Sequence, residues 1–196
     1  PGDRQAVDRQ VQDQREALVT ISKEFIMRQR IIGSQSDVDA LERAVIASTE
    51  ESLRSINATL TKNRGLSALA AIKFGHTGRD PLDSSRRLNL VETLIQSFSY
   101  LASIMATREL LVTHPSNARF VLSFGGSPGP AIVSRDGQVV AETFAATYPD
   151  SNRKLTKDVE KVRGVKARHR YVFFLSPIAA RPAMYDDVTV VQLDHE

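Results

Sequence analysis

The feature that most constrains the fold is a change in the spacing of apolar residues near Pro115. Before this point apolar residues recur every three or four positions, as they do along one face of an amphipathic helix. After it, short runs of β-branched and aromatic residues alternate with glycine and proline, which is typical of strands joined by turns. The two patterns predict an α+β protein, with a helical N-terminal region over residues 1–82 and a mixed sheet flanked by helices over residues 83–196.

Three long helices are predicted in the first half of the chain. One spans residues 4–32, and a second spans residues 37–61 with Ser36 as its N-cap. Their apolar stripes indicate that these two helices pack on each other or on a partner subunit, as elements that clamp DNA or form a dimer. The third is predicted over residues 84–111, after a short apolar piece at residues 66–74 that lies within loops.

The second half is predicted to contain mostly strands around one helix. The strands are expected at residues 119–124, 131–134, 138–146, 170–175 and 188–193. A tight turn at Arg135-Asp136-Gly137 joins the second strand to the third. The helix is expected at residues 152–162, with Asp150 or Ser151 as its cap. Counted from the third long helix, the order is helix, three strands, helix, strand and a further strand.

The composition is that of a folded globular protein and excludes several kinds of site. Hydrophobic residues make up 41% of the 196 residues, which is enough to build a core. The absence of cysteine excludes disulfides, zinc–thiolate sites and cysteine nucleophiles, and it fits the cytoplasmic location that we expect. No apolar run is long enough to span a membrane, and the net charge of +3 permits a phosphate-rich partner without requiring one.

The predicted hairpin at residues 131–146 carries the clearest candidate site. Neighbouring strands place one residue from each arm side by side, so Glu142 is expected to lie opposite position 131. Two carboxylates at such positions can hold Mg²⁺, which lowers the pKa of a bound water and neutralises the charge that grows on a phosphate. A nearby lysine helps to orient that water or stabilises the same charge.

The order of elements, together with Pro130-Ala131, ten further residues and Glu142-Thr143-Phe144, resembles the core of the PD-(D/E)XK nuclease superfamily, which includes many restriction endonucleases. The resemblance covers about residues 85–176. In that superfamily an aspartate opens the second strand, and an acidic residue and a lysine lie two apart on the third. The resemblance implies a restriction-endonuclease-like core and Mg²⁺-dependent hydrolysis of double-stranded DNA. Because each strand of a duplex needs its own active site, a homodimer is expected.

Two positions depart from the superfamily pattern. Ala131 stands where the aspartate is expected, and a methyl group cannot bind a cation, so the chain is expected to be catalytically impaired. One hypothesis is that Ala131 replaces an aspartate, by evolutionary loss or by deliberate substitution. Asp136 is the nearest substitute, but its place beside Gly137 favours a role in the turn. Phe144 stands where the lysine is usual.

Three residues are expected to carry the remaining catalytic roles. Glu142 is the expected Mg²⁺ ligand. Lys154, in the first turn of the helix at residues 152–162, would supply the missing lysine, a migration that the superfamily shows. Glu92 lies on the helix before the first strand, where many of these nucleases place a glutamate that reaches a metal-bound water; otherwise it belongs to the solvent face of that helix.

Polar and basic residues around the helix at residues 152–162 are candidate contacts with the DNA backbone, because helix N-termini and cationic side chains attract phosphates. These candidates are Asn152, Arg153, Lys157, Lys161, Arg168 and Arg170. The alternative is that they form a solvated surface.

The sequence therefore leaves three classes of function open. The first is a restriction-type DNA endonuclease that lacks one metal ligand. The second is a noncatalytic protein that retains the nuclease scaffold for binding DNA or protein. The third is a helical interaction protein in which the strands are only structural. The sequence contains no phosphate-binding P-loop motif and no zinc-ligand spacing, which excludes the enzyme classes that depend on them.

Overall fold

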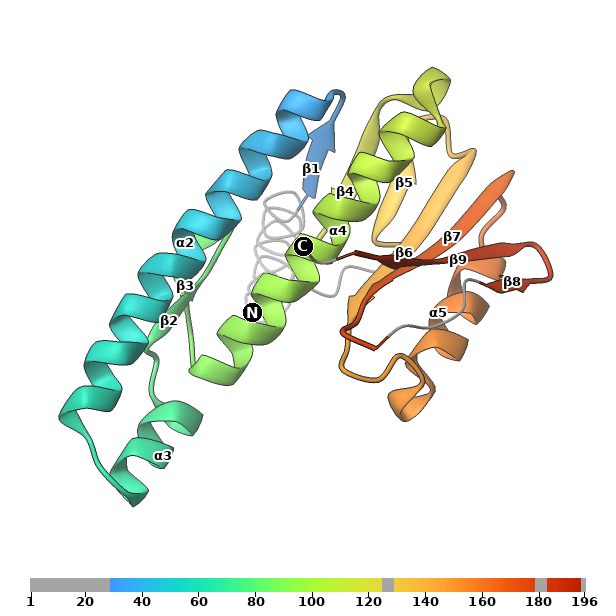
Figure 1. The fold of residues 1–196 in the computed structure, drawn as a ribbon. Helices are drawn as coiled ribbons and strands as arrows, with labels where there is room; N and C mark the ends of the chain where they lie inside the picture. Colours follow the sequence, from blue (N-terminus) through green and yellow to red (C-terminus); the bar gives the residue numbers. More distant parts are fainter. Residues whose placement is uncertain (1–28, 125–128, 179–182, 195–196) are drawn as a thin grey trace, which may run out of the picture.

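The computed structural model describes residues 29–124, 129–178 and 183–194, and it has the mixed α+β architecture that the sequence predicts (Figure 1). Its main sheet has seven strands. In spatial order they are β1 (Gln29–Ile32), β4 (Phe120–Ser123), β5 (Ile132–Ser134), β6 (Val139–Ala145), β7 (His169–Leu175), β9 (Val188–Leu193) and β8 (Ala183–Tyr185). Strands β6, β7 and β9 are parallel to one another, and every other pairing is antiparallel.

Helices cover both faces of this sheet. Helices α2 (Gln35–Lys62) and α4 (Leu90–Thr113) pack on one face, and α5 (Lys154–Arg163) packs on the other (Figure 1). Successive residues of β6 point to opposite faces, so Val139 joins the core under α4 while Val140 joins the core under α5. The remaining short elements are α3 (Leu66–Phe74), a separate hairpin of β2 (Gly78–Asp80) and β3 (Asp83–Leu88), and the 3₁₀ turns η1 (Pro115–Asn117) and η2 (Ser151–Arg153).

The order of helix, three strands, helix, strand and further strand is confirmed from α4 to β9. An additional short strand, β8, precedes the last one. The hairpin turn between β5 and β6 is also as predicted. Asp136 accepts hydrogen bonds there from the Ser134 hydroxyl and the Gln138 N–H, and Gly137 adopts a left-handed conformation with a φ of 69°. These bonds lower the pKa of Asp136 and identify it as a turn former.

Helix α2 matches its prediction, although its cap does not. Ser34, rather than Ser36, is the N-cap, and its hydroxyl accepts a hydrogen bond from the Asp37 N–H. Val38 and Val45 are buried seven residues apart, as an apolar stripe at helical spacing requires. Both valines belong to the core that lies between the sheet and α4, so α2 is part of the same packed unit as the sheet.

The prediction of a first helix over residues 4–32 is wrong at its C-terminal end, and its other residues lie outside those described. Residues 29–32 form β1, which pairs with β4 so that Ile32 lies opposite Phe120. Both of these side chains are buried. Burial of Ile32 against the sheet and a ladder of backbone hydrogen bonds outweigh the helical spacing of this short segment.

The predicted start of the third long helix is also wrong. Residues 83–88 form the strand β3, and α4 begins only at Leu90. Asn89 caps this helix: its side chain accepts a hydrogen bond from the Glu92 N–H at 2.9 Å, and the Glu92 carboxylate accepts one from the Asn89 N–H at 3.0 Å. This reciprocal capping box fixes the helix start at Leu90, six residues after the predicted start.

Helix α5 begins without the side-chain cap that the sequence predicts at Asp150 or Ser151. Its N-cap is Arg153, and both Asn152 and Arg153 adopt left-handed backbone conformations, with φ values of 55° and 57°. Two consecutive left-handed residues turn the chain sharply before the helix. The side chains of α5 that pack on the sheet are Leu155, Val159 and Val162, which are buried with residues of β6 and β7.

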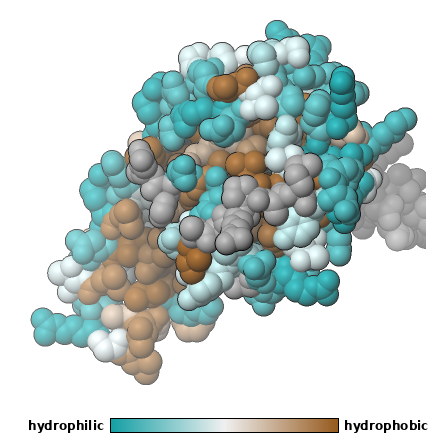
Figure 2. All heavy atoms as spheres, turned by 45° about the vertical axis from the view of Figure 1, so that its right-hand side comes forward, coloured by the Kyte–Doolittle hydropathy of each residue, from teal (hydrophilic) through white to brown (hydrophobic). Residues whose placement is uncertain are grey.

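Several apolar side chains remain on the surface, as the space-filling view shows (Figure 2). Among the described residues α4 carries five large ones, and α3 carries three of the most exposed, Leu66, Leu69 and Phe74, at 81%, 60% and 75%. None of the described helices is both long and apolar enough to cross a membrane.

Candidate phosphate-binding cavity

The hairpin of β5 and β6 places Glu142 beside position 131. Ile132 pairs with Ala141 in this antiparallel register, so Ala131 is the residue opposite Glu142. The backbone N–H of Ala131 donates a hydrogen bond to Oε1 of Glu142 at 3.1 Å. The juxtaposition that the sequence predicts is therefore present.

A cavity of about 410 Å³ opens where these two residues meet. Its walls come from the β2–β3 hairpin and α4 on one side, and from the ends of β4, β5 and β6 and the helix α5 on the other. Polar side chains dominate the lining: Arg86, Gln96, Ser99, Tyr100, Ser103, Ser123, Glu142, Thr143, Lys154 and Lys161. The cavity is suited to a polar, charged ligand rather than to an apolar one.

Glu142 is held in the cavity wall by a lysine from α5. Its side chain is 6% exposed, and Nζ of Lys161 lies 2.7 Å from its Oε1. Burial raises the pKa of Glu142, and so does the negative charge of Asp158, whereas Lys161 and the Ala131 N–H lower it. Desolvation is the largest of these effects, so Glu142 holds its negative charge less readily than a carboxylate in water.

Both helix lysines line the cavity, but the one that contacts Glu142 is Lys161, whereas Lys154, the predicted catalytic lysine, pairs with Asp158. Lys154 lines the same cavity, but its Nζ lies 2.6 Å from Oδ1 of Asp158 and 5.6 Å from the ring centroid of Phe144. The two lysines are seven residues apart, which is about two turns of a helix. They therefore share one side of α5 at different heights, and only the later one reaches Glu142.

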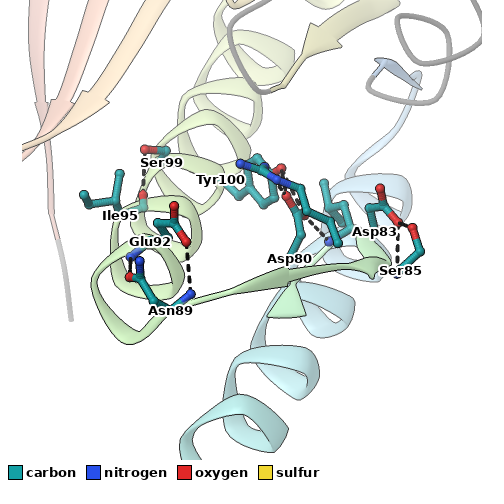
Figure 3. Close-up of polar contacts among 10 residues, drawn as sticks. Asp80, Asp83, Ser85, Asn89, Glu92, Ile95, Ser99 and Tyr100 are labelled. Atoms are coloured by element: carbon teal, nitrogen blue, oxygen red, sulfur yellow. Dashed lines mark hydrogen bonds and ion pairs between the residues drawn. The ribbon is translucent and has the colours of Figure 1, made fainter. Parts of the chain in front are cut away.

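The opposite wall contains a third cation that the sequence analysis does not identify. Arg86, on β3, places Nη1 2.9 Å from Oδ2 of Asp80. The Tyr100 hydroxyl, on α4, donates to the same carboxylate from 3.0 Å and 3.1 Å (Figure 3). The backbone N–H of Leu82 donates to Asp80 as well, at 2.9 Å. This network fixes Arg86 at the edge of the cavity.

The three cations follow one arrangement. The side chains of Arg86, Lys154 and Lys161 are 39%, 45% and 43% exposed, whereas their carboxylate partners are 3%, 5% and 6% exposed. Each positive group thus faces solvent while its negative partner lies behind it in the protein. An anion that enters the cavity meets the positive groups first.

The residues present do not fit a Mg²⁺ site. Glu142 is the carboxylate that lines the cavity, and its Oε1 already accepts from Lys161 and from Ala131. No group of three His, Cys, Asp or Glu side chains that could hold a metal occurs in the described part of the chain. Magnesium needs several oxygen ligands in octahedral geometry, and Ala131 offers none from its side chain.

The other predicted site residues lie away from the cavity. Glu92 is exposed and serves the capping box of α4. Arg170 is partly buried and tied to the protein, with Nε donating to the Val165 carbonyl and Nη1 2.8 Å from Asp187. The remaining candidates are exposed and do not line the cavity: Asn152, Arg153, Lys157 and Arg168.

Comparison of the chain with protein-family models, with curated proteins and with solved structures finds no match. The function is therefore inferred from the cavity itself.

Proposed function

We propose that this chain binds the phosphodiester backbone of double-stranded DNA in the cavity, on a restriction-endonuclease-like core that lacks one metal-binding carboxylate. The observation that carries the proposal is the convergence of Arg86, Lys154 and Lys161 on one cavity, each half-exposed above a buried carboxylate. Phosphate oxygens accept hydrogen bonds from such groups, and the Ser123 hydroxyl, which accepts from Gln29, can add a neutral donor.

DNA is favoured over other phosphate ligands by the position of the cavity in the fold. It lies where the second and third strands of a helix, three strands, helix, strand arrangement meet, and there the superfamily that the sequence resembles binds the scissile phosphate. Glu142 and the α5 lysines occupy the region in which that superfamily keeps its acidic residue and lysine. Both features support a nuclease-type relation to the DNA backbone.

Hydrolysis is the activity that we expect of a form with an aspartate at position 131, and not of the chain with Ala131. Position 131 lies directly beside Glu142, so an aspartate there would bring a second carboxylate to the cavity. With Ala131 we infer that the chain binds DNA without efficient Mg²⁺-dependent cleavage. A twofold homodimer belongs to this proposal, because two sites would be needed to engage both strands.

The binding proposal is tested by fluorescence polarisation with a labelled duplex at several salt concentrations. We expect the logarithm of the affinity to fall steeply and linearly with the logarithm of the salt concentration, because each neutralised phosphate releases counterions. The informative variant combines Lys154→Met with Asp158→Asn, which removes the cation without leaving a buried charge unpaired. It should weaken binding several-fold and reduce the salt slope by about 1.

The control is Lys62→Met, which removes one lysine from the C-terminal end of α2, where it does not line the cavity. It should leave both affinity and slope nearly unchanged. Two outcomes would contradict the proposal: an affinity that does not depend on salt, or equal losses in the cavity variant and in the control.

A further inference from the structure

We propose that Arg86 is a phosphate-binding residue of this cavity and that Asp80 and Tyr100 are its positioning residues, so that a bound phosphodiester is held between the β2–β3 hairpin and α5. The inference rests on the proposed function and extends it by assigning a role to the hairpin, which lies outside the nuclease resemblance except for its last residues.

Asp80 is a costly residue at its position. It is 2% exposed, and a carboxylate so far from water must be compensated by close donors. Its two oxygens accept from the Tyr100 hydroxyl, from Nη1 of Arg86 and from the Leu82 N–H (Figure 3). The compensation joins the hairpin to α4 and gives the guanidinium of Arg86 one fixed orientation.

Arg86 keeps donors for a ligand in that orientation. A guanidinium has five N–H groups in a planar fork, and Asp80 engages Nη1. Within the described residues Asp80 is the hydrogen-bond partner of Arg86, whose side chain is 39% exposed and lines the cavity. A fork held from behind by one carboxylate can present its other side to a phosphate, and the match between guanidinium and phosphate is commonly bidentate.

The next residue provides an internal comparison. Residues 86 and 87 are both arginines on β3, but consecutive residues of a strand point to opposite sides. Arg87 lies opposite Arg79 in the hairpin and lines a different cavity of about 240 Å³, together with Ser52 and Ser55 of α2. The hairpin therefore carries two arginines of equal charge, of which only Arg86 faces the cavity with Lys154 and Lys161.

The two walls then act on one phosphate group from opposite sides. Arg86 approaches from the β2–β3 hairpin, while Lys161 and Lys154 approach from α5. Lysines act as point charges, whereas the arginine adds directional recognition of the phosphate oxygens. The arginine is thus expected to contribute more to affinity than its charge alone.

The test measures duplex DNA binding by fluorescence polarisation across a salt series for Arg86→Ala, Arg86→Lys and the matched control Arg87→Ala. We expect Arg86→Ala to weaken binding about tenfold and to lower the salt slope by about 1, while Arg87→Ala changes affinity less than about twofold. Arg86→Lys keeps a charge beside Asp80, so it is the variant to rely on if Arg86→Ala unfolds; it should still lose about threefold because the fork is absent.

Asp80→Asn tests positioning against charge. It removes the negative charge behind Arg86, which by itself would strengthen phosphate binding, and it loosens the orientation of the guanidinium. An affinity that falls about threefold with the salt slope of the wild type therefore reports lost positioning, and an unchanged or higher affinity would overturn the positioning role of Asp80. Equal affinities for the wild type, Arg86→Ala and Arg86→Lys would overturn the role of Arg86 and leave the proposed function standing. Absence of DNA binding by the wild-type chain would overturn the proposed function, and this inference with it.

Discussion

The two walls of the cavity have the same arrangement of charges, but different contacts hold it in place. On each wall a half-exposed cation lies above a buried carboxylate: Arg86 above Asp80 on the hairpin wall, and Lys161 above Glu142 on the α5 wall. The hairpin carboxylate accepts bonds at both oxygens, from a tyrosine, an arginine and a backbone N–H. On the α5 wall the observed contacts from Lys161 and Ala131 both reach Oε1 of Glu142.

This difference indicates different tasks. Asp80 has its lone pairs engaged within the protein and does not line the cavity, so it acts as an anchor. Glu142 lines the cavity, and burial raises its pKa. A proton or a new charged neighbour can therefore change the charge of Glu142 at the cavity surface. The hairpin wall is therefore the fixed side of the cavity, and the α5 wall is the responsive side.

Loss of the Asp80 carboxylate, on the fixed side of the cavity, is expected to have the largest effect on stability. Asp80→Ala would leave the Arg86 guanidinium, the Tyr100 hydroxyl and the Leu82 N–H without their acceptor, and we expect a loss of about 3 kcal/mol in the free energy of unfolding. Urea denaturation measures this loss. The control is Asp186→Asn, which breaks the salt bridge between Arg163 and an Asp186 carboxylate that is 85% exposed, and which suits the left-handed φ of 54° at this position. That change should cost less than about 1 kcal/mol, and equal costs would contradict the anchoring role of Asp80.

The second prediction adds a neighbour on the responsive side. Ala131→Asp would place a carboxylate beside Glu142, and we expect Mg²⁺-dependent cleavage of plasmid DNA to rise at least about a hundredfold over the present chain, since metal stabilisation of the transition state is worth several kcal/mol. Ala131→Asn is the isosteric control and should show no such rise. Adding Glu142→Gln to the aspartate variant should abolish the gain. If Ala131→Asp shows no cleavage, the endonuclease relation loses its main support.

The two walls also differ in how far the sequence predicts them. Strands β4 to β7 are apolar runs whose positions are visible in the sequence, and the short Asp136-Gly137 turn fixes the register that pairs position 131 with Glu142. The α5 wall follows from this regular geometry. The choice of lysine does not, because Lys154 and Lys161 share one side of α5 and their spacing does not show which of them lies level with Glu142.

The hairpin wall could not be predicted in this way. Strand β3 has the sequence DSSRRL, in which a single apolar residue, Leu88, is buried. Strands are recognised from alternating apolar residues, so a polar strand held by hydrogen bonds resembles a loop or a helix start. The pairing of Asp80 with Tyr100 spans 20 residues across a hairpin and a helix, and no local spacing indicates it. The sequence thus predicts the α5 wall, which depends on burial, and does not predict the hairpin wall, which depends on polar contacts.

The smallest expected effect is a change of stability with pH that is caused by Glu142. Because burial raises the pKa of Glu142 in the folded state, the folded chain holds this proton more tightly than the unfolded chain does. Below the ordinary glutamate pKa both states are protonated and the residue contributes no difference. As pH rises from that value through the raised folded pKa, the unfolded state ionises more readily, and stability falls.

Glu142→Gln removes this dependence, so the free energy of unfolding of the wild type relative to the variant should decrease as pH rises through that window and level off above it. Chemical denaturation at a series of pH values measures the difference. Glu160→Gln, an exposed position on the same helix as Lys161, corrects for general changes in charge. A wild-type stability that instead increases relative to Glu142→Gln over the same range would mean that Lys161 and the Ala131 N–H outweigh desolvation, and that Glu142 is as firmly anchored as Asp80.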